Sequence, residues 1–158
     1  YAHQKGVLHR DLKPENVMVD LQKDPETQAW RSASVKVVDF GLAFDSQSSQ
    51  ITQSGDVLGT LDYLAPERIR GLADDARSDQ YAVGIMAFEI LSGQSPFPRT
   101  SAAETLMQRL TCQAPDLTTL RPDLPGHVRR AVGRMLALEM SDRYANLEDA
   151  LADLTQSA

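Results

Sequence analysis

The sequence has little cysteine, no long apolar run and no excess of basic residues. Its single cysteine, Cys112, excludes an internal disulfide and a CxxC metal pair, which fits a reducing compartment. The most apolar stretch, Tyr81 to Leu91, is far shorter than the roughly 20 residues of a membrane-spanning helix and contains Glu89. A net charge of −6 disfavours nucleic acid and anionic membranes as partners. These absences predict a cytoplasmic chain that contacts neither a membrane nor nucleic acid.

Other absences concern the start of the chain and its ligands. None of the nine glycines forms a GxG pair, so the sequence contains no glycine-rich phosphate-binding loop. No signal peptide is visible, and the first residue is Tyr1 rather than a methionine, which indicates a fragment or a processed chain. His3 and His127 have no cysteine or carboxylate set at metal-ligand spacing, so neither is predicted to bind a metal.

The length predicts one domain over residues 1–158, and the helical patterns along the chain predict that it is mainly α. With 42% hydrophobic residues the chain can bury a core of its own. Ser78 is expected to cap a long helix that ends at Ser92-Gly93, and apolar residues on every face predict that this helix is buried at the centre. Gly6 is expected to end an initial helical turn in a left-handed conformation. Shorter packing helices are predicted to run from Ser101 to about Leu110, from Gly126 or His127 to about Leu138, and from the cap Asn146 to Leu154.

Two β-branched runs, about 17–19 and 35–38, predict the strands of a short hairpin. The connection between them, Asp20 to Ser34, is longer than a normal hairpin loop and contains the only tryptophan, Trp30. Two interpretations stay open. The connection is either a surface insertion, which adds little to the entropy of loop closure, or a docking site that uses Trp30.

The stretch from His9 to Asn16, HRDLKPEN, places an acid, a cation and an amide in one loop before the first strand. Asp11 can accept or orient a hydroxyl proton, Lys13 can neutralise a transferring phosphoryl group, and Asn16 can hold a magnesium ion through its side-chain oxygen. Asp39-Phe40-Gly41 follows the second strand directly, where a carboxylate beside a flexible glycine suits a metal bound to nucleotide phosphates. Together the two motifs indicate a phosphoryl-transfer site.

The motifs resemble, in type and order, those of the serine/threonine protein kinases. HRDLKPEN matches the kinase catalytic loop, and VVDFGLA matches the metal-binding motif. GTLDYLAPE matches the segment that ends in APE. Two further matching motifs, SDQYAVG and DRY, follow in the family's order. The match extends from residue 9 to residue 144, and the closing region looks most like bacterial members. The resemblance implies the carboxy-terminal lobe of a kinase domain, with a central helix at about 78–92 beside the hairpin. It also implies that the amino-terminal lobe, which supplies the ATP-binding lysine and its glutamate, is a missing partner.

The resemblance assigns roles to the residues of the two motifs. Asp11 and Lys13 are implied to be catalytic, and Lys13, Asn16 and Asp39 to contact ATP and Mg²⁺, with Asn16 and Asp39 as the metal ligands.

Further residues are implied to support the site. Thr60 would contact Asp11 and Lys13, Asp79 would hold the backbone of the catalytic loop, and Glu67 would pair with Arg143. The family usually has a proline before this arginine, but Glu139-Met140-Ser141-Asp142 precedes it here, so the local turn stays open. Leu42 to Gly59 would be the activation loop, with Thr52 or Ser54 phosphorylated and Arg10 as the basic partner.

The resemblance implies ATP- and Mg²⁺-dependent phosphorylation of serine and threonine in protein substrates by a longer protein, and an inactive isolated chain. An aminoglycoside-type phosphotransferase also has a His-x-Asp loop, but Lys13 and Ala65-Pro66-Glu67 argue against it. A non-catalytic interaction module derived from a kinase is the other alternative, and the intact site residues argue against it without excluding it. Glu15 is either a contact for a basic substrate peptide or a solvated loop charge.

Overall fold

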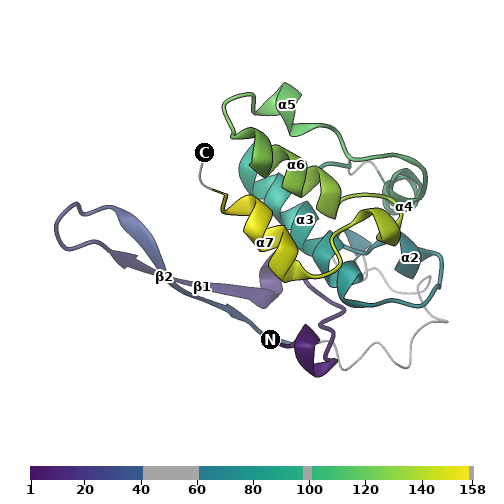
Figure 1. The fold of residues 1–158 in the computed structure, drawn as a ribbon, viewed down its shortest axis with the longest axis horizontal. Coiled ribbons are helices and arrows are strands. Elements are labelled where there is room, and N and C mark those ends of the chain that lie inside the picture. Colours follow the sequence, from purple (N-terminus) through teal and green to yellow (C-terminus); the bar gives the residue numbers. More distant parts are fainter. Residues whose placement is uncertain (41–60, 98–100, 157–158) are drawn as a thin grey trace.

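The computed structural model describes residues 1–40, 61–97 and 101–156, which form a helical body and a two-stranded ribbon that projects from it (Figure 1). The elements along the chain are η1 (His3–Lys5), η2 (Pro14–Asn16), β1 (Val17–Lys23), β2 (Trp30–Val37), α2 (Pro66–Ile69), α3 (Ala76–Ser92), α4 (Ala102–Thr111), α5 (Leu117–Leu120), α6 (Gly126–Met135), η5 (Met140–Asp142) and α7 (Leu147–Leu154). The mainly α prediction is confirmed. Within the described ranges, no helix has the length and apolar character needed to cross a membrane.

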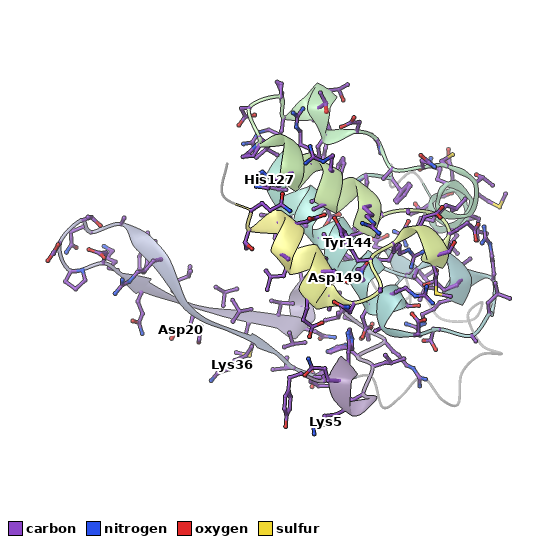
Figure 2. All side chains as sticks on the ribbon, viewed as in Figure 1. Lys5, Asp20, Lys36, His127, Tyr144 and Asp149 are labelled. Atoms are coloured by element: carbon purple, nitrogen blue, oxygen red, sulfur yellow. The ribbon has the colours of Figure 1, made fainter. Side chains whose placement is uncertain are left out.

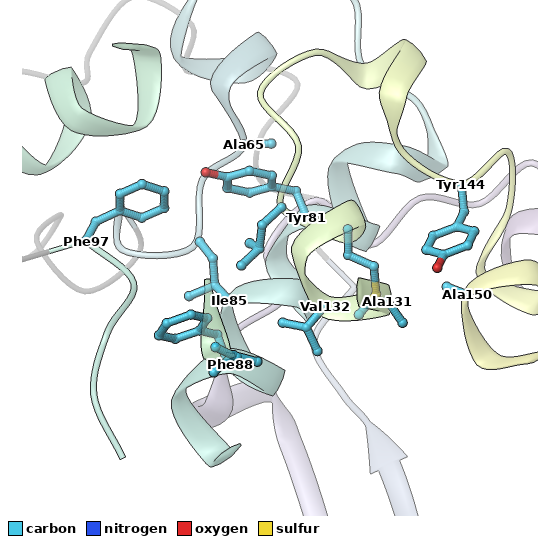
Figure 3. Packing of buried hydrophobic residues seen from close by; sticks show 12 residues of the cluster. Ala65, Tyr81, Ile85, Phe88, Phe97, Ala131, Val132, Tyr144 and Ala150 are labelled. Atoms are coloured by element: carbon cyan, nitrogen blue, oxygen red, sulfur yellow. The ribbon is translucent and has the colours of Figure 1, made fainter. Parts of the chain in front are cut away.

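Helix α3 forms the centre of the body, as its apolar sequence predicted. Its buried side chains include Tyr81, Ile85 and Phe88, which pack with α6 and α7 in the core shown in Figure 3. The prediction that every face of α3 is buried was wrong, because Ile90 is 83% exposed. Gly84 permits the close packing of α3 on α6, since a Cβ there would lie only 3.0 Å from the Cβ of Met135.

The ends of α3 are set by local side chains and backbone. The helix begins earlier than predicted, because the Asp75 side chain accepts a hydrogen bond from the Arg77 amide and acts as the cap. Ser78 is therefore inside the helix, where its hydroxyl donates to Oε1 of Glu67 over 2.5 Å. Gly93 ends the helix with φ 75°, as predicted.

The remaining cap predictions are mostly right. Ser101 accepts from the Glu104 amide at 3.2 Å and caps α4, and Asn146 accepts from the Asp149 amide at 2.8 Å and caps α7. Gly6, with φ 73°, ends the first turn. Helix α6 stops at Met135 instead of near Leu138, and the carbonyls beyond it turn toward the side chain of Arg143.

The hairpin is present but much longer than predicted. Strands β1 and β2 pair antiparallel from Val17 opposite Val37 to Lys23 opposite Trp30, so most of the expected loop at 20–34 is strand. Only residues 24–29 form the turn. There Oδ1 of Asp24 accepts from the amides of Glu26 and Thr27, both at 3.0 Å, and these hydrogen bonds lower the pKa of Asp24.

Candidate active site

A buried carboxylate fixes the backbone of the HRDLKPEN loop. Asp79, in the first turn of α3, accepts from the amides of His9 and Arg10, each at 2.8 Å, and lies 2.8 Å from Nε2 of His3. Arg10 has φ 65°, a left-handed conformation that typically costs on the order of 1 kcal/mol in a residue other than glycine. The two bonds to Asp79 thus hold a strained turn immediately before Asp11.

The imidazole of His9 connects this loop to the strand that leads to Asp39. Nε2 donates to the carbonyl of Val38 at 2.9 Å, while Nδ1 accepts from the Asp11 amide at 3.3 Å, which requires the tautomer with its proton on Nε2. The Val38 amide also donates to the carbonyl of Asn16 at 2.9 Å. Consequently, the two motifs that are far apart in the sequence meet through Val38, the residue before Asp39.

Two of the predicted site residues, Lys13 and Asn16, converge on the carboxylate of a third, Asp11. Nζ of Lys13 lies 3.1 Å from Oδ2 of Asp11, and Nδ2 of Asn16 lies 3.2 Å from the same oxygen. Asn16 is buried at the end of η2, where Nδ2 also donates to the Asp11 carbonyl at 2.8 Å. This leaves Oδ1 of Asn16 as the side-chain acceptor.

Asp39 differs from these three because it is exposed. Its φ is 55°, so it and Arg10 both have left-handed backbone at the two edges of the site. Among the residues that the structure describes, none donates a hydrogen bond to the Asp39 carboxylate. Thr60, Thr52 and Ser54, together with the predicted activation loop, lie outside the described residues.

Asp74 and Arg68 contact the HRDLKPEN loop at Arg10, and sequence reasoning missed both. Arg68 donates from Nη1 to the carbonyl of Arg10, and its Nε lies 3.6 Å from Oδ2 of Asp74. The same oxygen of Asp74 lies 3.5 Å from Nε of Arg10. Burial is the main reason why the pKa of Arg68 is lowered, although the nearby charges of Asp74 and Asp79 oppose this shift. No local sequence pattern distinguishes Asp74 from an ordinary loop carboxylate.

Glu67 pairs with Arg143, the arginine that the family resemblance implied. Nη1 and Nη2 of Arg143 lie 2.9 Å from Oε1 and Oε2 of Glu67, and both side chains are almost fully buried, at 0% and 4% exposure. The other Arg143 donors reach the carbonyls of Arg77, Ala137 and Leu138, so the guanidinium is fully hydrogen-bonded. The conformation of the chain just before Arg143, which the sequence left undetermined, is the 3₁₀ helix η5.

The protonation of Glu67 should make stability fall in acid. Burial alone would raise the pKa of Glu67, but the hydrogen bonds from Arg143 and Ser78 and the charge of Arg143 outweigh it, so the pKa of Glu67 is lowered from its ordinary value. A lowered carboxylate pKa contributes stability above its unfolded value and loses it as the pH falls through the folded value. We expect the free energy of unfolding in urea to decline below about pH 4.5. A stability that stays constant down to about pH 3 would contradict this.

Arg109 is a buried cation that sequence reasoning also missed. It lies on the inner side of α4 with 0% exposure, and it donates to the carbonyls of Leu61 and Asp62, with the Phe97 ring centroid 5.7 Å away. It therefore holds the segment that precedes Ala65-Pro66-Glu67. A basic residue on an amphipathic helix is usually solvated, so no local sequence pattern predicts this burial.

Replacement of Arg109 by methionine should destabilise the fold through these carbonyls. The substitution keeps the apolar part of the side chain and removes every donor, so the partly buried carbonyls of Leu61 and Asp62 lose their hydrogen bonds. We expect a loss of about 2 to 4 kcal/mol in urea unfolding. Arg130→Met, at an exposed position, should change the free energy by less than about 0.5 kcal/mol. Equal effects of the two substitutions would show that Arg109 does not anchor the segment.

Comparison with known proteins places the chain among the kinases. A sequence model of the protein kinase domain matches residues 1–154. The chain is 35% identical to the probable serine/threonine-protein kinase PknB of Lactococcus lactis and to the serine/threonine-protein kinase PrkC of Bacillus subtilis, over 99% and 98% of its length. It is 39% identical to the serine/threonine-protein kinase pkn3 of Myxococcus xanthus over 97% of its length. The matched region covers only 23%, 22% and 28% of these three relatives.

Proposed function

The chain belongs to the protein kinase domain family, and from this premise we propose that residues 1–158 form the carboxy-terminal lobe of a serine/threonine protein kinase. The helical body around α3, with the hairpin beside the catalytic loop, supports this assignment. In this proposal the amino-terminal lobe is supplied by sequence upstream of Tyr1. The activity is cytoplasmic, which fits the free and exposed Cys112.

The proposed reaction is the transfer of the γ-phosphoryl group of ATP to serine or threonine hydroxyls of protein substrates. The observation that carries the proposal is the convergence of Lys13 and Asn16 on Oδ2 of Asp11, in a loop whose backbone is held by Asp79. The described contacts of the Asp11 carboxylate fall on Oδ2, so Oδ1 can receive the substrate hydroxyl. As the hydroxyl oxygen bonds to the γ-phosphorus and the bond to the β-phosphate oxygen breaks, Asp11 takes the hydroxyl proton.

The neighbouring residues fit a magnesium ion. Oδ1 of Asn16 and the exposed carboxylate of Asp39 are oxygen donors on the two motifs that meet at Val38. Within the described residues, no group of three or more His, Cys, Asp or Glu side chains is placed to bind a metal, and magnesium typically takes few protein ligands and completes its shell with phosphates and water. Bound Mg²⁺ would neutralise charge on the phosphates of ATP. Lys13 adds a further positive charge beside Asp11.

The proposal extends to regulation and substrate class. Thr52 or Ser54 is the proposed phosphorylation site, and the phosphate would compete with Asp74 for Arg10, whose Nε lies 3.5 Å from that carboxylate. Thr60 is proposed to contact Asp11 and Lys13. Glu15 is exposed next to the catalytic residues, where it would meet a basic residue of the substrate peptide.

An upstream-extended form of the protein decides between this function and its alternatives. We expect it to bind Mg-ATP in calorimetry and to phosphorylate a serine- or threonine-containing peptide but not an aminoglycoside. Absence of Mg-ATP binding would favour a non-catalytic interaction module. Phosphorylation of the aminoglycoside alone would favour a small-molecule phosphotransferase.

A further inference from the structure

The projecting β1–β2 ribbon separates apolar from polar side chains. Successive side chains of a strand point to opposite faces, so Val19 and Leu21 of β1 share one face, and the register places Val35 opposite Val19. The other face carries Met18, Asp20, Gln22, Arg31 and Lys36. In Figure 2 the side chains of Asp20 and Lys36 leave the same side of the ribbon.

A bulge in β2 brings Trp30 onto the apolar face. Asp20 pairs with Ser34, but Leu21 pairs with Ser32, so one extra residue, Ala33, interrupts the alternation. If the side chains of β2 alternated regularly from Ser34 to Trp30, with no bulge at Ala33, Trp30 would lie on the same face as Asp20. With it, Trp30 pairs with Lys23 on the face of Leu21, and Nζ of Lys23 lies 5.1 Å from the centroid of the Trp30 ring. We call Val19, Leu21, Trp30 and Val35 the ribbon face.

The ribbon face is uncovered among the described residues. Its four side chains are 50%, 55%, 66% and 59% exposed, in chain order. Together they present on the order of 400 Å² of apolar surface, a size at which exposed patches mark interaction sites. A two-stranded ribbon is marginally stable in water unless its apolar face packs on something. The turn at 24–29 is nevertheless closed by specific hydrogen bonds to Asp24, so the ribbon has one defined register.

The position and charge of the ribbon face favour a second copy of the same chain as its occupant. The ribbon extends away from the helical body, so two ribbons can pack face to face while the bodies stay apart (Figure 1). Asp20, Arg31 and Lys36 are on the opposite face, and the Lys23 ammonium lies over the Trp30 ring at the end of the strands, so no charged side chain lies between Val19, Leu21 and Val35 at the centre of the contact. Two such faces bury on the order of 1,000 Å², including their rims, which corresponds to a weak interface.

We propose that the ribbon face packs against the ribbon face of a second copy, forming a weak symmetric dimer. This goes beyond the proposed kinase function and does not depend on it. The base of the ribbon is left out of the contact. There Val17 and Val37 line a separate hollow of about 400 Å³, together with Tyr1, Ala2 and Met86.

The 158-residue chain itself provides the test, because Trp30 is its only tryptophan. Sedimentation velocity from low micromolar to several hundred micromolar concentration should show a monomer–dimer equilibrium. Over the same range, Trp30 emission should shift to the blue and acrylamide quenching should weaken. A chain that stays monomeric throughout, or a dimer in which Trp30 stays quenchable, overturns the proposal.

A pair of matched variants locates the contact. Leu21→Asp places a charge on the ribbon face at a position that is 55% exposed, whereas Met18→Asp does so on the opposite face at 60% exposure. We expect Leu21→Asp to raise the dimer dissociation constant at least ~30-fold and Met18→Asp to change it less than ~3-fold. Equal effects of the two variants overturn the proposal. If Leu21→Asp alters the circular dichroism of the chain, its effect on dimerisation is not used. The blue shift and the weaker quenching of Trp30 in the unmodified chain then decide whether the ribbon face forms the contact.

Discussion

The substitution Asp11→Asn is expected to lower kcat for peptide phosphorylation about 10³-fold in the upstream-extended protein. The amide is nearly isosteric with the carboxylate and can keep the contact with Lys13 or Asn16 on its oxygen, but it cannot accept the hydroxyl proton. The affinities for ATP and peptide should change little, because in the proposed mechanism Asp11 acts on the proton only as the bond forms. Steady-state kinetics with a serine peptide, varying each substrate in turn, would separate kcat from the two KM values.

A matched control distinguishes the effect of losing the carboxylate at position 11 from the effect of losing one negative charge elsewhere in the protein. Asp20→Asn makes the same chemical change on the polar face of the ribbon and should leave kcat within about twofold. The midpoint temperatures of thermal unfolding of both variants should lie close to that of the unmodified protein. If Asp11→Asn keeps more than a tenth of the activity, Asp11 is not the proton acceptor.

The substitution Arg143→Met is expected to lower the free energy of unfolding of the chain by about 3 to 5 kcal/mol. It leaves the Glu67 carboxylate buried without its bidentate partner, and it also removes donors from the carbonyls of Arg77, Ala137 and Leu138. A domain of this size is typically stable by only about 5 to 15 kcal/mol, so the variant should unfold at much lower urea concentration. Urea titration followed by circular dichroism measures the difference.

Two comparisons show whether the buried charge is the cause. Arg31→Met removes a pair whose arginine is exposed, in which Nη1 lies 3.6 Å from Oδ2 of Asp24, and it should cost less than about 1 kcal/mol. Adding Glu67→Gln to Arg143→Met should recover part of the loss, because no uncompensated carboxylate then stays buried. If Arg143→Met is as mild as Arg31→Met, the pair does not anchor the fold.

Features encoded by local chemistry were predictable from the sequence. Ser101 and Asn146 were recognised as caps because the side chain of a cap accepts a hydrogen bond from an amide three residues later. Gly93 was recognised because a left-handed residue favours glycine. The pairing of Glu67 with Arg143 came from the family resemblance, since nothing in either local sequence indicates a contact 76 positions apart.

Features that depend on tertiary contacts were not predictable. Asp75 and Ser78 are both good caps, and Ser78 is inside α3 because its hydroxyl contacts Glu67 on α2. The hairpin was underestimated because Asp20, Gln22 and Lys23 are poor strand formers, whereas the alternation with Val19 and Leu21 extends the pairing. Arg109 has the sequence environment of a solvated residue, and only the fold brings the carbonyls of Leu61 and Asp62 to it.

In the proposed function, Asp11, Lys13 and Asn16 form one side of an active site, and the sequence contains no glycine-rich loop to hold ATP from the other side. Phosphoryl transfer from labelled ATP to a serine peptide should therefore be compared for the 158-residue chain, the upstream-extended protein and its Asp11→Asn variant. We expect incorporation with the extended protein only. Incorporation by the 158-residue chain alone that disappears in its own Asp11→Asn variant would contradict the assignment of this chain as one lobe of a two-lobed kinase.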